Sequence, residues 1–404
     1  MASPAPEKLS GRLAIVARRA PLPPFSGIGL IVHNITTRLS LHYDVRVFLT
    51  DDELPAAGVL GGLPVEAAGS GAYSDAGARV SGGEFRNRVA RYYGITRARE
   101  EWLRAGLERF APQAVLGFGY DIAPYLEAVR DRYATVADPI DAEVLYLWRQ
   151  IRQGEINLTV LKHLLASMQL ARQLRHVDAI VTVAEEDSRN LRRLAGHGEV
   201  TTIANGVDCD FYAPRTGLAT VPGRVIFTGS LNWVPNVQAV EWFLHGCWPQ
   251  VRAARPDASF VIIGKGMSEA QKSAFESHAG VTARGFVDDV REHVLAAEVS
   301  VAPMVSGSGI KNKILEAWAM QRAVVATSVA ARGLEGRDSL LVADDAAGFA
   351  REVLKLLGDA PLRARLGESG RRVAEQRYSW EAAGRAFGAV VEGARRSHSS
   401  RMRS

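Results

Sequence analysis

Cysteine is scarce in this chain, which holds only Cys209 and Cys247 among its 404 residues. Two such residues supply neither a disulfide framework nor the paired spacing of a zinc site. No run reaches the roughly eighteen apolar residues that a membrane-spanning helix needs, and the amino terminus lacks the apolar core of a signal peptide. These absences favour a soluble protein of the reducing cytoplasm, with peripheral association at the inner membrane surface left open.

Basic residues are in slight excess, but they do not gather into a nucleic-acid groove. Lys and Arg number 49 against 44 Asp and Glu, for a formal net charge of +5. No basic run is interleaved with aromatic residues as a single-strand groove requires. The excess fits an anionic small molecule or an acidic membrane surface better, so nucleic acid is not an expected partner.

The length exceeds the usual ceiling for one hydrophobic core, so two domains are expected. Short apolar runs rich in β-branched residues alternate with longer stretches of helical periodicity, which is typical of βα units on a parallel sheet. The expected strands are residues 12–17, 44–50, 113–119, 133–138 and 178–184 in the first half, and 224–230, 259–266, 281–287, 299–304 and 323–327 in the second.

A stretch rich in Gly, Pro and Thr, residues 205–223, lacks periodicity and marks the domain boundary. We expect an N-terminal Rossmann-like domain over residues 12–210 and a C-terminal one over 221–380. The fold class is then α/β, with two doubly wound domains facing a cleft. Residues 381–404 are expected to form a helix that can cross back to the first domain, followed by a basic disordered tail.

A loop of small residues turns into a helix within residues 306–327, SGSGIKNKILEAWAMQRAVVAT. It follows an expected strand, and Rossmann-like sheets bind ligands at the carboxyl ends of their strands. Small residues let the backbone approach a phosphate, and helix amides from about Gly309 would be free donors. Lys311 and Lys313 add positive charge, and Glu316 suits the vicinal hydroxyls of a ribose. An ordinary capped helix with solvated charges is the alternative.

Several segments together resemble the GT-B glycosyltransferases, and among them the family 4 retaining nucleotide-sugar transferases. The resemblance implies that the C-terminal domain binds a nucleotide-diphosphate sugar and that the N-terminal domain receives an acceptor. The segments that carry it are residues 227–243, 260–266, 281–304, 307–327 and 377–387 in the second half, and 23–29, 181–191 and 204–214 in the first.

The resemblance also implies roles for residues on the donor side. Glu316 matches the glutamate that such enzymes place on the donor ribose. Phe286 and Val287 match the strand end beside the nucleotide base. The other matches are Gly229 and Ser230 at the first turn of the domain, and Ser306, Gly307, Ser308 and Gly309 in the loop that faces the sugar and diphosphate.

Two departures from the family pattern change the charge at this site. Ser308 stands where many members have a second glutamate, and residues 230–236 lack the Arg and Lys that often neutralise the diphosphate. Lys311 and Lys313 are the expected substitutes, because two phosphates in a partly desolvated cleft need paired positive charge. We expect Lys311 to be catalytic, since Lys313, two positions on, would be rotated away around the helix. No metal or other cofactor is expected.

On the acceptor side, no histidine occupies the strand end where the family often has one. Asp138 and Asp141 follow an expected strand and could orient acceptor hydroxyls, with Asp138 as the catalytic candidate. A helix N-cap and a solvated turn are the alternative for both. The acceptor-side candidates are Gly27, Gly29, Tyr120, Asp121 and Asp141.

Other motifs point elsewhere but are incomplete. Residues 208–210, DCD, contain the D-x-D that holds a metal in GT-A transferases, but they lie in the interdomain crossing. The dinucleotide fingerprint fails because its third glycine is Val32. Two readings therefore stay open: an active transferase, or a catalytically silent binding or scaffolding protein of the same fold. The acceptor could be a glycan, a lipid-linked molecule or a small natural product.

Overall fold

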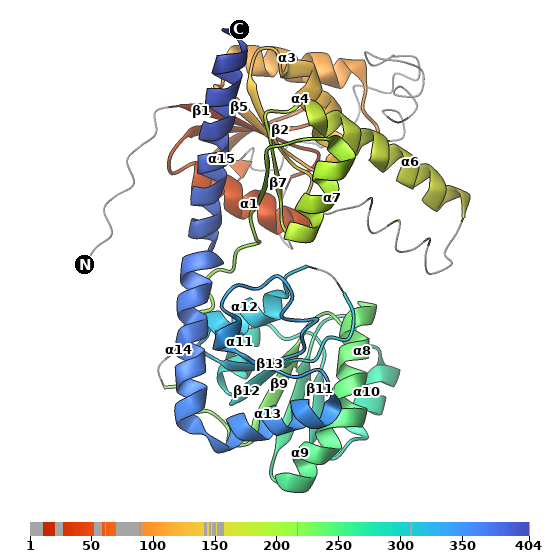
Figure 1. Cartoon of the computed structure of the whole chain (residues 1–404), viewed down its shortest axis with the longest axis vertical. Helices are drawn as coiled ribbons and strands as arrows, with labels where there is room; N and C mark the ends of the chain where they lie inside the picture. The colour runs from red at the N-terminus through yellow and green to blue at the C-terminus, as the bar shows by residue number, and fades with distance from the viewer. Residues whose placement is uncertain are drawn as a thin grey trace, which may run out of the picture. The chain divides into compact units, whose positions relative to one another are not determined.

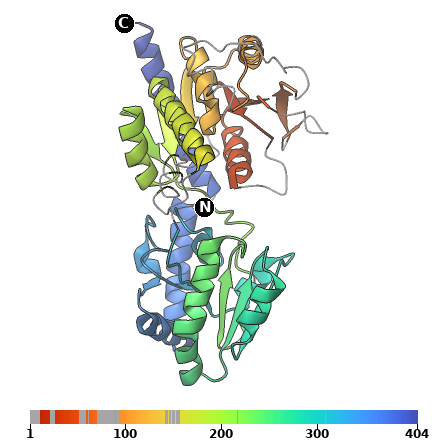
Figure 2. The same ribbon diagram turned by 90° about the vertical axis from the view of Figure 1, so that its right-hand side faces the viewer.

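A computed structural model gives the fold of the chain (Figure 1). It divides into two compact units: unit 1 consists of Met1–Ala204 and Ala383–Ser404, and unit 2 of Asn205–Ala382. Helices cover both faces of the sheet in each unit (Figures 1 and 2). The residues that the structure describes are 11–20, 27–51, 59–60, 62–69, 89, 93–140, 144, 147, 151, 157–215, 217–307 and 309–403.

Unit 1 is built on a sheet with the strand order β3-β4-β2-β1-β5-β6-β7-β8 in the described part of the chain. The strands pair in parallel except for β3 and β4, which pair antiparallel. The sequence predicts five of these strands and misses β3, β4 and β8. The bounds are β1 Arg12–Ala17, β2 Asp44–Leu49, β3 Val59–Leu60, β4 Leu63–Ala67, β5 Ala114–Phe118, β6 Ala134–Asp138, β7 Ala179–Thr182 and β8 Val200–Thr202.

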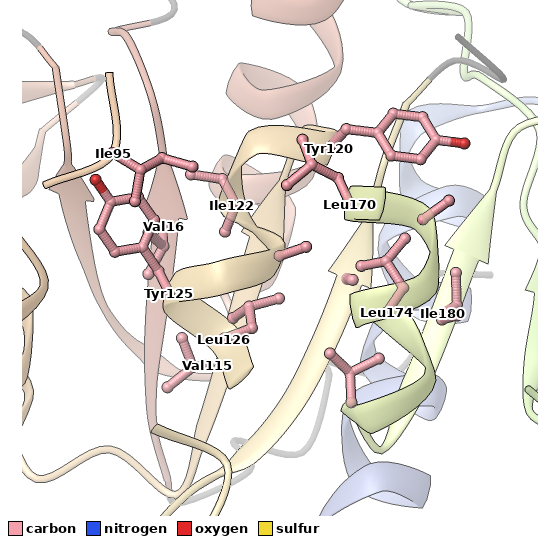
Figure 3. Packing of buried hydrophobic residues seen from close by; sticks show 14 of the residues in the cluster. Val16, Ile95, Val115, Tyr120, Ile122, Tyr125, Leu126, Leu170, Leu174 and Ile180 are labelled. Atoms are coloured by element: carbon pink, nitrogen blue, oxygen red, sulfur yellow. The ribbon is translucent and has the colours of Figure 1, made fainter. Parts of the chain in front are cut away.

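The core of unit 1 forms between its sheet and the helices laid against it. Figure 3 shows Ile122, Tyr125 and Leu126 on the α4 side of this core and Val16 and Val115 on the strands. The central strands are apolar throughout because both faces of the sheet are covered. The helices are α1 Gly27–Leu39, α3 Arg97–Phe110, α4 Ala123–Val129, α6 Leu158–Gln173 and α7 Glu185–Ala195.

Unit 2 has a fully parallel sheet among its described strands, in the order β11-β10-β9-β12-β13-β14. Numbered within the unit this is 3-2-1-4-5-6, the order of the doubly wound dinucleotide-binding fold. The strands are β9 Arg224–Thr228, β10 Ser259–Ile263, β11 Val281–Arg284, β12 Val299–Ala302, β13 Ala323–Ala326 and β14 Leu341–Val342. The helices are α8 Val234–Trp242, α9 Trp248–Ala254, α10 Glu269–Glu276, α11 Val290–Leu295, α12 Asn312–Ala319, α13 Ala346–Gly358 and α14 Ala360–Arg377. The last helix, α15 Trp380–Arg401, begins at the end of unit 2 and belongs to unit 1 from Ala383 onward.

Each strand order reverses direction at one point, and that point is where open α/β sheets bind ligands. In unit 2 the reversal lies between β9 and β12, whose carboxyl ends lead into Gly229 and into the loop that contains Gly307. In unit 1 it lies between β1 and β5. The topology therefore selects one edge of each sheet before any side chain is considered.

The predicted disordered tail is wrong, because α15 continues as a helix to Arg401. The helix is fastened to unit 1 along its length. Tyr43 Oη donates to Glu392 Oε1 at 2.8 Å, and Arg401 Nη1 pairs with Asp178 Oδ1 at 2.7 Å. A basic segment of small and polar residues looked unable to fold alone, but unit 1 supplies the carboxylates that neutralise it.

The chain passes between the units twice, and inside unit 2 the two passages meet. Val207 forms an isolated parallel bridge with Ser379. Gly206 is needed here because a methyl group at this position would lie 2.4 Å from the Trp380 ring. A search of the described residues found no helix with both the length and the apolar character that a bilayer span requires.

We expect Asp178→Ala to lower the free energy of unfolding of unit 1 by about 2 to 3 kcal/mol. Asp178 is buried and accepts from Thr135 N at 2.8 Å, so its loss leaves that amide unpaired. Arg401→Ala is the control, because the Arg401 side chain is 45% exposed and should cost less than about 1 kcal/mol. Urea unfolding measures both, and equal costs would contradict this account of the helix anchor.

Candidate functional site

The turn after β9 is shaped for close approach of other groups. Gly229 has φ 154°, a value that side chains rarely adopt, and its N–H donates to Ile263 O at 2.9 Å. A methyl group on Gly229 would lie 2.8 Å from Asn236 Nδ2 and 3.0 Å from Lys313 Nζ. Glycine is therefore required here for both conformation and space, and two polar side chains converge on it.

The helix expected from about Gly309 begins later, at Asn312, with Lys311 as its N-cap residue. Gly307 and Gly309 have φ values of 99° and 73°, in the left-handed region that a right-handed helix does not use. These two glycines delay the helix by about one turn. Because Lys311 precedes the first helical residue, the argument that rotation around the helix separates it from Lys313 does not apply.

The ammonium group of Lys313 lies at the switch point of unit 2, where the strand order reverses between β9 and β12. Its Nζ donates to Asn236 Oδ1 at 2.6 Å and lies 4.0 Å from the centre of the Phe227 ring. Asn236 is itself fixed, since its Nδ2 donates to Ser230 O at 2.8 Å. Burial lowers the pKa of Lys313 to about 7, although the charge of Glu316 partly opposes the shift. The residue as a whole is half-buried.

Lys311 lies over the loop on the other side of this point. It is 5% exposed, and its Nζ donates to Gly309 O at 3.1 Å and lies 6.0 Å from the Trp233 ring centre. Burial, and then the nearby charge of Arg332, lower the pKa of Lys311 to about 8. A methyl group on Gly307 would lie 3.5 Å from this Nζ. Lys311 therefore lies beside the glycine turn that follows β12, as Lys313 lies beside Gly229 after β9.

Glu316 follows Lys313 by one helical turn on α12. Burial raises the pKa of its carboxyl group, while the Lys313 charge and the nearby Tyr212 side chain oppose the increase. Part of the side chain remains exposed. The structure thus brings a carboxylate and an ammonium group together at one sheet edge, a pairing able to hold a hydroxyl pair and an anion side by side.

The remaining donor-side residues line neighbouring strand ends. Phe286 follows β11 and is 74% exposed, while Val287 packs against the apolar cluster beside it. Ser230 is partly exposed after β9, and Ser306 Oγ donates to Gln238 Oε1 at 2.6 Å. Ser308 lies outside the described residues. An exposed aromatic face at the edge of a ligand site is suited to stacking.

In unit 1 the acceptor-side candidates lie at or near the corresponding edge. Gly27 and Gly29 are in the first turn of α1, and Tyr120 is buried just after β5. Asp121 accepts from Arg18 Nη1 at 3.4 Å, and Arg18 also pairs with Asp51 at 2.7 Å. Neither Arg18 nor Asp51 was identified from the sequence, because nothing in their local pattern signals the pairing.

Asp138 ends β6 with no exposed surface. Its Oδ1 accepts from Ile140 N at 2.8 Å and closes a turn in which Ile140 has φ 69°. Asp138 thus closes a buried turn, which is neither the helix N-cap nor the solvated turn given as the alternative, and its catalytic role stays a prediction from the sequence. Asp141 lies outside the described residues.

In the D-x-D sequence, the Asp208 side chain closes a turn of the backbone. Asp208 Oδ1 accepts from Asp210 N at 3.1 Å and from Phe211 N at 2.8 Å. Among the described residues, no cluster of three or more His, Cys, Asp or Glu side chains is arranged to hold a metal ion. The hydrogen bonds of Asp208 are a sufficient structural reason for its presence in this segment.

We expect the two lysines of this site to titrate near neutrality, Lys313 at about 7 and Lys311 at about 8, because both ammonium groups are desolvated. Glu316→Gln should lower the pKa of Lys313 further, since it removes the charge that favours the protonated form. NMR of ¹⁵N-labelled lysine measures both, with Lys311→Arg and Lys313→Arg assigning the signals. Titration of both groups at the usual lysine pH would contradict the described burial.

Comparison with known proteins places a family match on unit 2. Residues 222–359 match the model of the family described as glycosyl transferases group 1. A lipopolysaccharide core biosynthesis glycosyltransferase, LpsE, of Rhizobium meliloti is 31% identical over 138 residues, and an uncharacterized 44.6 kDa protein of the Klebsiella pneumoniae cps region is 29% identical over 140. Each match covers 32% of this chain, and 40% and 36% of the respective relative.

Solved structures match both units together. Sucrose-phosphate synthase from Thermosynechococcus elongatus has a TM-score of 0.66 at 16% identity, covering 95% of this chain and 98% of that one. Anabaena HepE in complex with UDP and glucose has a TM-score of 0.61 at 14% identity, covering 94% and 99%. At these identities the likeness shows the fold, and it confirms the predicted GT-B architecture of two Rossmann-like units.

Proposed function

We propose that this chain is a retaining glycosyltransferase, which moves a hexose-type sugar from a nucleotide-diphosphate sugar to an acceptor hydroxyl. The observation that carries the proposal is the group of Lys311, Lys313 and Glu316, which the loop before α12 and the helix itself place at the switch point of unit 2. The family match over residues 222–359 covers the same segment. UDP and glucose bound to a protein of similar fold support a donor of this class.

The diphosphate of the donor is assigned to Lys313 and Lys311. Both ammonium groups are buried enough to have lowered pKa values, so an anion bound between them replaces lost hydration. Lys313 also provides positive charge beside Gly229, the turn where the family's Arg and Lys are absent from this chain. A metal is not needed for charge balance in this arrangement.

The nucleoside is assigned to the next turn of α12, one turn after Lys313. Glu316 accepts hydrogen bonds from the ribose hydroxyls, each of which contributes about 1.5 to 3 kcal/mol when the acceptor is charged. Phe286 offers an exposed ring at the end of β11, and Val287 lies next to it. Together with the two lysines, these three residues divide the donor into base, ribose and diphosphate contacts along one sheet edge.

The transfer step follows from these contacts. The bond from the sugar C1 to the diphosphate oxygen breaks, the bond from C1 to the acceptor oxygen forms, and the acceptor proton passes to an oxygen of the leaving diphosphate. Negative charge grows on that diphosphate as C1 becomes oxocarbenium-like, so a lysine held against it stabilises the transition state more than the bound donor. No pair of carboxylates is required.

The acceptor is assigned to unit 1, at the edge formed by the ends of β1 and β5. Tyr120 and Asp121 follow β5, while Gly27 and Gly29 open α1. Asp121 is held by Arg18, so its carboxylate has a fixed orientation toward any bound hydroxyl. A glycan, a lipid-linked molecule or a small natural product each presents such hydroxyls. A cytoplasmic location, with or without contact at the inner membrane surface, stays a prediction from the sequence.

A donor panel tests the proposal directly. Purified protein is titrated with UDP-, GDP- and dTDP-sugars by calorimetry and assayed for hydrolysis of each donor. At least one donor should bind, and its affinity should fall as pH rises above about 7 to 8, because deprotonation removes the lysine charges. EDTA should leave turnover unchanged, whereas a loss that Mn²⁺ restores would show metal dependence.

The outcome of the panel also separates the enzyme from a catalytically silent protein of the same fold. Binding without hydrolysis or transfer would favour the silent binding protein. No binding of any donor at pH 6.5 to 7, roughly at or below the lysine pKa values, would contradict the proposal as a whole.

We expect Lys313→Met to lower kcat by about a hundredfold, the scale of losing one preorganised electrostatic donor, with a smaller rise in the donor KM. Lys311→Met should have the smaller effect, because its ammonium group is already bound to Gly309 O and almost fully buried. Met keeps most of the aliphatic stem, so packing should change little.

Lys162→Met is the matched control, because Lys162 is exposed on α6 in unit 1. Steady-state kinetics on the three variants decides the assignment. A crippled Lys311→Met beside a near-normal Lys313→Met would return the catalytic role to Lys311, as the sequence alone suggested.

A further inference from the structure

A large aromatic side chain lies open to solvent at the donor edge of unit 2, meaning the edge of its sheet where β9 and β12 end. Trp233 directly precedes the first residue of α8 and is 45% exposed. Tryptophan is highly buried on average in folded proteins, so an indole ring left this open calls for a reason. Its place at the sheet edge assigned to the donor suggests that a ligand covers it.

The neighbours of Trp233 fix its position without covering it. Its carbonyl oxygen accepts from Asn236 N at 2.9 Å, at the start of α8. A methyl group on Gly307 would lie 3.3 Å from Trp233 Cη2, so the loop after β12 passes along the rim of the indole. Lys311 Nζ lies 6.0 Å from the ring centre. The ring is thus held between the turn after β9 and the loop after β12, beside a lysine assigned to the diphosphate.

The segments on either side of the ring have little to offer a sugar except the ring itself. Residues 229–236, GSLNWVPN, and residues 304–310, MVSGSGI, contain no charged side chain. Neither segment therefore supplies a carboxylate or a cation to hold sugar hydroxyls. The transferred sugar is bonded directly to the terminal phosphate of the donor, so a diphosphate bound at Lys311 brings that sugar to the neighbourhood of Trp233.

We propose that Trp233 binds the transferred sugar, with the C–H face of a pyranose packed on the exposed indole ring. This inference rests on the proposed function, which assigns the diphosphate to the two lysines. The face of an aromatic ring carries partial negative charge, and the C–H hydrogens of a sugar carry partial positive charge. Stacking also removes apolar surface of both partners from water. Trp233 should therefore add affinity for a nucleotide sugar but none for the nucleotide alone.

The test compares nucleoside diphosphates with their sugar conjugates by calorimetry at neutral pH. The pairs are UDP with UDP-glucose, GDP with GDP-mannose, and dTDP with dTDP-glucose. The sugar ratio is the dissociation constant of the nucleoside diphosphate divided by that of its conjugate, taken for the pair that wild type binds most tightly. We expect Trp233→Leu to lower this ratio about tenfold, the scale of one stacked aromatic contact. The affinity for the nucleoside diphosphate itself should stay unchanged.

Three further variants show whether the effect belongs to the ring face of Trp233. Trp233→Phe keeps an aromatic face and should retain most of the sugar ratio. Phe286→Leu removes the exposed ring assigned to the base, so it should weaken both members of a pair by the same factor. Trp242→Leu is the matched control on the same helix, because its half-buried ring meets that of Phe349 edge to face at 5.5 Å. It should leave both affinities unchanged.

A second measurement keeps the test decisive if Trp233→Leu fails to fold. Wild-type protein labelled with 5-fluorotryptophan is observed by ¹⁹F NMR, and Trp233→Phe assigns the Trp233 signal. That signal should shift more with the sugar conjugate than with the nucleoside diphosphate, because only the conjugate covers the ring. Equal shifts with both ligands would contradict the stacking contact.

The outcomes separate this inference from the proposed function. No binding of any of these nucleotides to wild type would contradict both. Nucleotide binding beside a wild-type sugar ratio in Trp233→Leu would overturn only the role of Trp233. Equal weakening of the nucleoside diphosphate and its conjugate in Trp233→Leu would assign Trp233 to the support of the loops around the diphosphate, and would likewise overturn its role as a sugar-binding residue.

Discussion

The ammonium group of Lys313 at the turn after β9 is the constraint on which the rest of the site depends. It is held where the sheet reverses its strand order, and Asn236 offers it only a neutral oxygen. Taking a cation out of water without full compensation is costly, and the lowered pKa of Lys313 records that cost. The negative charge of Glu316 compensates this cost only in part, and an anionic ligand bound at this edge would stabilise the ammonium group further.

The loop before α12 decides which groups share that edge. Left-handed Gly307 and Gly309 delay the helix until Asn312. Lys311 consequently stays outside the helix and folds back over its own loop, while Lys313 and Glu316 occupy successive turns. A helix that began a turn earlier would include Lys311 and place it on a different face from Lys313, whereas Lys313 and Glu316 would keep their spacing. The glycines therefore set the electrostatics of the site through backbone geometry alone.

What the sequence predicts and what it misses follow from the range of the interactions. Apolar runs and the glycine-rich loop report local preferences, so the main strands and the position of the Lys311 to Glu316 segment are correct. The helix start is misplaced because left-handed φ values at two glycines have no distinct sequence signal. Asn236 and Tyr212 are missed because each meets α12 only through tertiary packing. Asn236, for example, precedes its partner Lys313 by 77 residues in the sequence.

The meeting of Val207 with Ser379 gives the chain the connectivity of an inserted domain. Unit 2 is one continuous segment whose two ends lie beside each other, and it interrupts unit 1 between Ala204 and Ala383. A gene fragment for unit 2 alone would thus retain its whole sheet. A fragment that stops at Ala204 would lack the segment that supplies Glu392 and Arg401 to Tyr43 and Asp178, so unit 1 is completed only after all of unit 2 has been synthesised.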